Sequence, residues 1–261
     1  MNPIISIVAI LAVTSLLLVP VVTVYADTSL KMTGSQWSIL ELLGSKIKTS
    51  HANAVPTGGV EFLFPDATAT PAGYANLLTN GFTASLTTSN TLTATIKVLT
   101  SSSTTMFVGN PNGGCPASSP IYCPGAVRLY FTSNLPQAGM SSCLGFNGNS
   151  QHAVVANEFD YWWSNTPVRA MTGILGSYYQ FSPTGGGSNG PIMLQVSLDP
   201  MNWSDLCGHF GFMFPAAFIA SISNIKNLGV SFGSGFFFEN GVGVRGTTGT
   251  ATFQMTSYTI S

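Results

Sequence analysis

Short stretches of alternating hydrophobic and polar residues recur along most of the chain and predict β-strands. Alternation with a period of two places one face of a strand in a core and leaves the other face polar. Turn-forming residues separate the stretches. The stretches are residues 60–64, 82–86, 92–98, 106–108, 127–131, 153–163, 192–198, 210–214, 228–232, 236–239 and 250–260. So many short strands predict an all-β fold, an antiparallel two-sheet β-sandwich.

One segment before these strands has a different pattern. Residues 37–48 (WSILELLGSKIK) show some helical spacing, with Glu41 and Lys48 on the polar side, although Gly44 weakens a helix. We expect a short helix or a lead-in segment there. The predicted organisation is therefore a lead-in over residues 27–58 and one sandwich domain over residues 59–261, a size that such folds reach as single domains.

The N-terminal segment indicates the compartment. Residues 4–26 carry no charge and are mostly Ile, Leu, Val and Ala, about the 20 apolar residues that cross a bilayer. Pro20 interrupts the run, and Val24-Tyr25-Ala26 forms a small-x-small cleavage motif before Asp27. Residues 1–26 are expected to be a cleaved signal peptide or an uncleaved membrane anchor. Both place the rest of the chain outside, as a secreted or extracellular cell-surface protein.

A low content of charged residues agrees with export and limits the partners. Charged residues make up 7% of the chain, against roughly 25% in an ordinary soluble domain, and Ser, Thr, Asn and Gly supply the polarity instead. The net charge of −1 excludes the basic surface expected of a nucleic-acid-binding protein. No polybasic cluster indicates attachment to a membrane, so membrane contact is expected only through the N-terminal segment.

The cysteines of the chain are Cys115, Cys123, Cys143 and Cys207. In an oxidising compartment an even number favours two disulfide bonds, and four cysteines allow three connectivities. We expect Cys115–Cys123, which would close a Pro-rich loop, together with Cys143–Cys207, which would join distant segments. A zinc site is the alternative, but no CxxC or HxxxH spacing accompanies these residues.

The chain contains one acceptor sequence for N-glycosylation, Asn202-Trp203-Ser204. In an exported protein this sequon predicts a glycan on Asn202, in a surface turn. A glycoprotein is therefore expected.

The stretch with the most information covers residues 126–165. It contains an apolar strand, a Pro/Gly loop, the sequence LGFN at 144–147 and the sequence VVANEFDYW at 154–162. This order resembles the core of the L-type (legume-like) lectins of the concanavalin A-like superfamily, and residues 253–261 resemble the closing strand of that fold. The resemblance implies a concanavalin-like jelly roll and a lectin-like, carbohydrate-binding protein.

Two carboxylates, Glu158 and Asp160, lie at the centre of the resemblance. They are two residues apart, so both point to one face of a strand, and such a pair is costly unless it is paired or metal-bound. In the lectins, the matching residues bind a transition metal and calcium, which implies a divalent metal such as calcium here. Ser164 stands where the family has an Asn ligand, with Asn165 one residue later, so the ligand set is incomplete in sequence.

Aromatic residues beside these acids are the candidate sugar contacts. Tyr161, Trp162 and Trp163 follow Asp160 directly and would stack on sugar rings, with Asn165 nearby as a polar contact. Packing in the core is the alternative role for the aromatic residues.

The same carboxylates allow a catalytic interpretation, because glycosidases act with two carboxylates. Concanavalin-like hydrolases of the laminarinase type carry Glu-x-Asp-x-x-Glu on one strand, where this chain has Trp163 in the last place. Endoglucanases of a related type pair a Glu on a central strand with another near the C-terminus. Glu158 and Glu239 match that layout in position, so a secreted β-glycanase would use Glu158 with Glu239 or Asp160.

Three functions stay open from the sequence. The first is a carbohydrate-binding, lectin-like surface protein, and the second is a secreted β-glycanase. The third is a structural coat or filament subunit, favoured by the Ser/Thr-rich, low-charge composition. Carbohydrate is the expected partner, and self-association into a homo-oligomer stays open.

Overall fold

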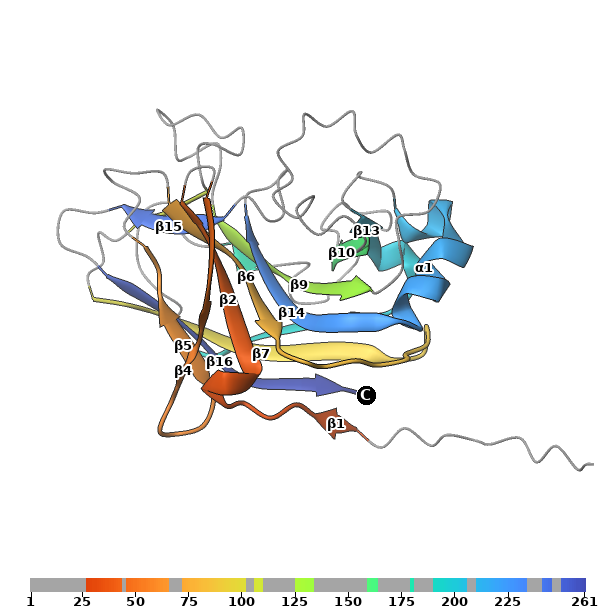
Figure 1. Ribbon diagram of the computed structural model, residues 1–261, viewed down its shortest axis with the longest axis horizontal. Helices are drawn as coiled ribbons and strands as arrows, with labels where there is room; N and C mark the ends of the chain where they lie inside the picture. The colour runs from red at the N-terminus through yellow and green to blue at the C-terminus, as the bar shows by residue number, and fades with distance from the viewer. Residues whose placement is uncertain are drawn as a thin grey trace, which may run out of the picture.

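The fold is an all-β sandwich of two antiparallel sheets, which confirms the predicted fold class (Figure 1). The computed structural model describes residues 27–43, 46–65, 72–101, 106–109, 125–133, 159–163, 179–180, 190–205, 210–233, 241–245 and 250–261. The predicted signal peptide or anchor, residues 1–26, lies outside the described residues.

The first sheet has six strands, and its regular alternation explains why it forms. Leu92, Ala94, Ile96 and Val98 are buried on one face of β7, whereas the Thr and Lys residues between them are half-buried on the other. The strand order is β12 (Ile192–Ser197), β7 (Thr91–Thr100), β16 (Ala251–Ile260), β5 (Val60–Leu63) and β4 (Asn53–Ala54), with β1 (Thr28–Ser29) paired to β16.

The second sheet has ten strands, and its strand β9 is buried on both faces. Its main order is β13 (Trp203–Asp205), β10 (Phe159–Trp163), β9 (Ala126–Ser133), β14 (Ile225–Gly233), β6 (Ala72–Thr79), β15 (Val242–Arg245) and β8 (Met106–Gly109). Three further strands extend it: β11 (Tyr179–Gln180) pairs with β9, β2 (Trp37–Leu43) with β6, and β3 (Lys46–His51) with β2.

Short helical elements connect the strands within the described residues. They are the 3-10 turns η1 (Gly34–Gln36), η6 (Pro200–Asn202) and η7 (Gly211–Met213), and the helix α1 (Pro215–Ile222). In that part of the chain, no helix is long and apolar enough to span a bilayer.

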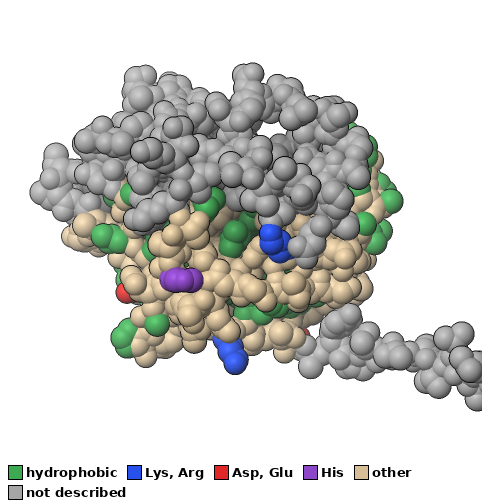
Figure 2. Space-filling view, viewed as in Figure 1, with side chains coloured by type: hydrophobic (Ala, Val, Ile, Leu, Met, Phe, Trp, Pro, Cys, Tyr) green, Lys and Arg blue, Asp and Glu red, His purple; other side chains and the backbone are tan. Residues whose placement is uncertain are grey.

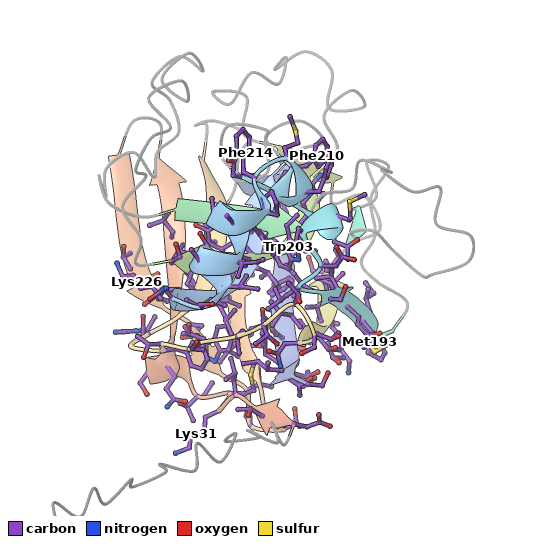
Figure 3. All side chains as sticks on the ribbon, turned by 90° about the vertical axis from the view of Figure 1, so that its right-hand side faces the viewer. Lys31, Met193, Trp203, Phe210, Phe214 and Lys226 are labelled. Atoms are coloured by element: carbon purple, nitrogen blue, oxygen red, sulfur yellow. The ribbon has the colours of Figure 1, made fainter. Side chains whose placement is uncertain are left out.

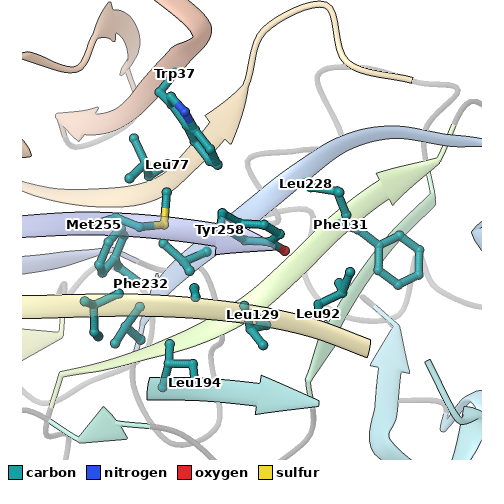
Figure 4. Close-up of a cluster of buried hydrophobic side chains, with 14 of the residues drawn as sticks. Trp37, Leu77, Leu92, Leu129, Phe131, Leu194, Leu228, Phe232, Met255 and Tyr258 are labelled. Carbon is teal, nitrogen blue, oxygen red and sulfur yellow. The ribbon is translucent and has the colours of Figure 1, made fainter. Parts of the chain in front are cut away.

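The core lies between the two sheets and is centred on aromatic rings (Figure 4). Phe62 and Phe253 from the six-stranded sheet contact Phe232 of β14, with ring centroids 5.4 and 4.9 Å from it and near-perpendicular planes. Edge-to-face pairs of this kind contribute about 0.5–1.5 kcal/mol beyond the area that they bury. The aromatic cluster therefore fixes how the sheets face each other.

The segment expected to be a short helix or lead-in is a β-hairpin instead. The helix predicted within residues 37–48 is wrong, because β2 and β3 pair with each other and β2 pairs with β6. Trp37 and Ile39 are buried on the core side of β2, and the Trp37 ring lies 5.8 Å from that of Tyr258. Burial against the facing sheet outweighs the weak helical spacing. Residues 27–58 thus contribute strands to both sheets.

Two other predicted strands are wrong in the structure. Residues 82–86 form only an isolated bridge from Ala84 to Ile225 instead of a strand. Residues 210–214 form η7 and lead into α1, because Pro215 occupies the first turn of that helix. Strands are confirmed at residues 60–63, 92–98, 106–108, 127–131, 159–163, 192–197, 228–232 and 251–260, whereas residues 153–158 and 236–239 lie outside the described residues.

Tyr258 is a titratable group in the core between the sheets. It projects from β16 toward β14, and its ring is fully buried (Figure 4). Burial raises the pKa of the Tyr258 phenol above its ordinary value of 10.0, because the phenolate would lose its hydration, while the nearby Gly229 backbone acts in the opposite direction. The neutral phenol is therefore the form that the fold stabilises.

This raised pKa predicts a loss of stability in alkali. Above pH 10 the phenol ionises in the unfolded chain but not in the fold, so the free energy of unfolding falls by about 1.4 kcal/mol per pH unit from this group. Tyr258→Phe removes that contribution and should make the decline shallower. Urea titrations of both proteins between pH 8 and 11 measure it; equal slopes would contradict the assignment.

Gly229 is required where β14 and β6 approach each other. A Cβ atom at this position would collide with the carbonyl oxygen of Leu77, which belongs to the backbone and cannot move aside like a side chain. Gly229 pairs with Leu78 of β6 on one side and with Tyr130 of β9 on the other. A side chain would therefore separate strands in the middle of the sheet.

Gly229→Ala should lower the free energy of unfolding by about 2–3 kcal/mol, the cost of overpacking a close backbone contact. Gly190→Ala is the matched control, because nothing lies within 4 Å of a Cβ atom placed there. We expect the control to stay within about 0.5 kcal/mol of the wild type. Equal unfolding midpoints in urea for the two variants would show that the sheet absorbs the extra atom.

Candidate functional site

The outer face of the ten-stranded sheet, the side away from the six-stranded sheet, is polar and yet buried. We call this surface the polar face, and its residues are Asn76, Arg128, Tyr130, Thr132, Ser204 and Ser231, none more than 3% exposed. The outer face of the six-stranded sheet differs, because its Thr, Lys and Gln side chains on β7 and β12 are half-buried or exposed. Burial of polar groups therefore distinguishes one sheet from the other.

Strand register arranges the polar face in rows that cross the sheet. Alternation along β9 sends Val127, Leu129 and Phe131 to the core and Arg128, Tyr130 and Thr132 to the opposite face. The first row joins Asn76 of β6, Ser231 of β14 and Arg128 of β9. The second joins Gly229, Tyr130, Trp162 and Ser204, and the third joins Asn227, Thr132 and Asp160.

Hydrogen bonds fix one end of the polar face. The Thr132 hydroxyl donates to Asn227 Oδ1 at 3.1 Å, and the Asn227 amide donates to the Thr79 carbonyl at 2.6 Å. Within the described part of the chain, the hydroxyls of Ser204 and Ser231 have no hydrogen-bond partner. A buried hydroxyl without a partner costs about 1–3 kcal/mol, so neither hydroxyl contributes a hydrogen bond to the fold within the described part of the chain.

Arg128 gives the polar face a buried positive charge. Its side chain is fully buried and contacts other residues. A guanidinium is always charged at neutral pH and carries five donors in a planar fork, which suits carboxylates and paired hydroxyls. Placing such a group inside a protein is expensive unless it is compensated. The first row therefore combines an amide, a hydroxyl and a cation in a protected setting.

The predicted site residues on β10 divide between the two faces. Asp160 and Trp162 occupy polar-face positions, opposite Thr132 and Tyr130. The neighbouring positions 161 and 163 lie opposite Phe131 and Trp203, whose side chains belong to the core. A sugar-stacking platform made by all three aromatic residues stays a prediction, and the register favours position 162.

Most other predicted site residues lie outside the described residues: Glu158, Asn165, Glu239, Cys115, Cys123, Cys143 and Cys207. The disulfide and two-carboxylate predictions thus stay predictions. Among the residues that the structure places, no three His, Cys, Asp or Glu side chains gather to hold a metal ion. Calcium binding by Glu158 and Asp160 also stays a prediction, since Glu158 falls outside.

The predicted glycosylation site is placed in a turn. Asn202 lies at the end of η6, where Asp199 caps the turn by accepting a hydrogen bond from the Met201 amide. The half-buried Asn202 side chain donates to the Ser197 hydroxyl at 3.0 Å. A glycan on Asn202 would compete with that bond, and glycosylation stays a prediction.

A recess with a cavity volume of about 260 Å³ lies beside Trp37. Its polar groups serve mainly to hold the fold. The Trp37 indole donates to the Lys31 carbonyl at 3.0 Å, and the Asn80 amide donates to the Ser35 carbonyl at 3.0 Å while its oxygen accepts from Ser38 at 2.6 Å. These bonds join the N-terminal strands to the end of β6. The polar face is therefore the stronger candidate site.

Asn76, Arg128 and Ser231 are candidate site residues that were not predicted from the sequence. One signal was present: Arg128 is among only eight basic residues and stands between Val127 and Leu129 in an apolar strand. Asn76 and Ser231 had no such signal, because their cross-strand alignment depends on the register of β6, β14 and β9.

Comparison with known proteins gives no assignment: no family model matches the chain, and no curated protein matches it. The interpretation of the site therefore depends on its own chemistry.

Because the hydroxyls of Ser231 and Ser133 make no hydrogen bond to the residues that the structure describes, we expect that removing them will not lower the free energy of unfolding. Ser231→Ala and Ser133→Ala each delete a buried hydroxyl without a hydrogen-bond partner in the described part of the chain. We expect each variant to equal or exceed the wild-type free energy of unfolding, by up to about 1 kcal/mol. Urea denaturation measures this, and a loss in either variant would show that its hydroxyl is engaged.

Proposed function

We propose that the protein is an extracellular carbohydrate-binding protein and that the polar face is its sugar-binding surface. One observation carries the proposal: buried polar groups gather on one face of one sheet, although apolar residues there would make a more stable sandwich. Costly polar burial of this kind is typical of binding sites, where specific polar groups are held in place by the surrounding fold.

The chemistry of the polar face suits a sugar. Sugar hydroxyls both donate and accept hydrogen bonds, and the face offers an amide at Asn76, hydroxyls at Ser204 and Ser231, and donors at Arg128. Aromatic groups bind the apolar side of a sugar ring, which is a role for the residue at position 162, in the row of Tyr130. The set provides specificity without needing a net charge.

The dimensions of the face match a short oligosaccharide, which would reach it only if the chain that buries it moves aside, because none of its residues is more than 3% exposed. Arg128 and Thr132 are four residues apart on one strand, a span of roughly 13 Å. Four neighbouring strands, β6, β14, β9 and β10, give a similar width at about 4.8 Å per strand. The resemblance of residues 126–165 to L-type lectins supports the same assignment, since β9 and β10 lie in that stretch.

A matched pair of serine variants tests this function. Ser231→Ala removes a hydroxyl from the polar face, whereas Ser133→Ala removes one from a position opposite Ile225, which belongs to the core. In a glycan-array screen followed by calorimetry, we expect the wild type to bind a glycan. Ser231→Ala should bind it roughly two- to tenfold more weakly, the value of one hydrogen bond. Ser133→Ala should bind like the wild type.

Two outcomes would contradict the proposal: no glycan bound by the wild type at neutral or acidic pH, or equal affinities for both variants. A release assay for reducing sugars from β-glucans, run on the wild type and on Glu158→Gln, separates binding from hydrolysis. Sugar release that disappears in Glu158→Gln would replace the binding function with that of a glycanase. Silence in both assays would favour a structural role.

A further inference from the structure

An exposed group of large apolar side chains covers η7 and the start of α1. We call it the aromatic knob, and its members are Phe210, Phe212, Met213, Phe214 and Ile219. Four of them are 39–53% exposed, and Phe210 is partly exposed and stacks on Phe212 with centroids 5.5 Å apart. Hydrophobic side chains gather at the right-hand edge of the molecule in Figure 2. Residues 206–225 contain no Asp, Glu, Lys or Arg.

The opposite side of α1 anchors the knob to the core. Phe218 is fully buried, with its ring centroid 6.0 Å from that of Phe131 and 6.5 Å from that of Trp203. Ile222 is also buried at the end of the helix. A helix that is apolar on all sides is normally covered on all sides. Here one side packs on the sandwich and the other is exposed, which marks an interaction surface.

The knob and the beginning of the described chain lie at the same end of the sandwich. The Ile222 carbonyl accepts a hydrogen bond from the Leu86 amide at 2.8 Å, and the turn after Leu86 ends at Asn90. The Asn90 side chain donates to the Ser261 carbonyl at 3.3 Å, and β1 pairs with the last residues of β16 beside it. Figure 1 shows α1 at the upper right of the molecule and β1 with the C-terminus below it, near the lower edge.

We infer that the aromatic knob inserts into a lipid surface, at the boundary between headgroups and acyl chains. The chain preceding Asp27 includes 23 uncharged residues, 4–26, and it reaches the fold through β1 at this same end. Held at a bilayer through that segment, the protein would turn the knob toward the lipid. Phe, Met and Ile bury apolar area there with no charge to dehydrate.

Figure 3 views this end of the molecule directly. Phe210 and Phe214 lie at its top, and the Lys31 and Lys226 labels lie below them. The knob is therefore a neutral apolar surface with basic residues elsewhere on the same end, so it needs no anionic lipid for insertion. Its expected partner is a neutral phosphatidylcholine surface.

A tryptophan reporter tests the insertion. The full chain is reconstituted in phosphatidylcholine vesicles, with the four native tryptophans as baseline. Phe214→Trp should lose roughly half of its added emission to lipids brominated near the headgroup, because interfacial helices sit about 5–10 Å deep. Leu63→Trp is the matched control: position 63 is similarly exposed, at 53%, but lies on β5 of the other sheet. Its added emission should stay unquenched.

Equal quenching in the two variants, or none in either, would overturn the inference. Emission from Phe214→Trp that shifts to the blue with protein concentration, together with dimers in sedimentation, would assign the knob to a second copy of the chain instead. Phe212→Trp provides the same readout if the first variant does not fold. The glycan assay on the polar face is independent, so the two proposals can fail separately.

Discussion

The structure depends on the aromatic contact between the two sheets, where Phe62 and Phe253 meet Phe232. This contact decides which face of each strand is inside. Once Phe232 and its alternate neighbours on β14 point to the core, Ser231 and Gly229 must lie on the other face, because a strand has a period of two. Because Ser231 pairs with Arg128 on β9 and with Asn76 on β6, these two residues lie on the same face as Ser231. The polar face is thus a consequence of core packing, and a shift of one residue in β14 would destroy both together.

The two sheets differ in where they place polar side chains. In the six-stranded sheet, β7 buries Leu, Ala, Ile and Val and leaves Thr and Lys half-buried, which satisfies the hydrophobic effect at no polar cost. In the ten-stranded sheet, burial on both faces would favour apolar residues, as in other sheets covered on both sides. Arg128, Asn76 and Ser231 break that rule on adjacent strands. Departures from local rules that cluster in one place are expected at functional sites, since elsewhere selection for stability removes them.

The sequence predicts those parts of the fold whose signal is local. Alternation alone locates β7 and β16, since each of them carries its pattern within ten residues. It fails for β2, where weak helical spacing competes with alternation and only the pairing with β6 decides. The polar face is even harder to predict from the sequence. Arg128 is a visible exception in an apolar strand, but its row with Ser231 and Asn76 forms only when three strands, separated by long stretches of chain, are in register. Local sequence propensity predicts single strands, whereas a site that crosses a sheet depends on which strands become neighbours.

Charged residues are rare in this chain, so a buried charged side chain is a notable feature of the fold. With 17 charged residues among 261 (8 basic plus 9 acidic), most of the polar groups of the chain are hydroxyls and amides. Arg128 is nevertheless fully buried in the middle of β9. Arg128 interacts with other residues there, and a buried ionic group of this kind is weak evidence for a role in stability. A fixed, protected set of donors is what Arg128 adds. Arg128 and its row are therefore the residues to examine first when a ligand of the protein is sought.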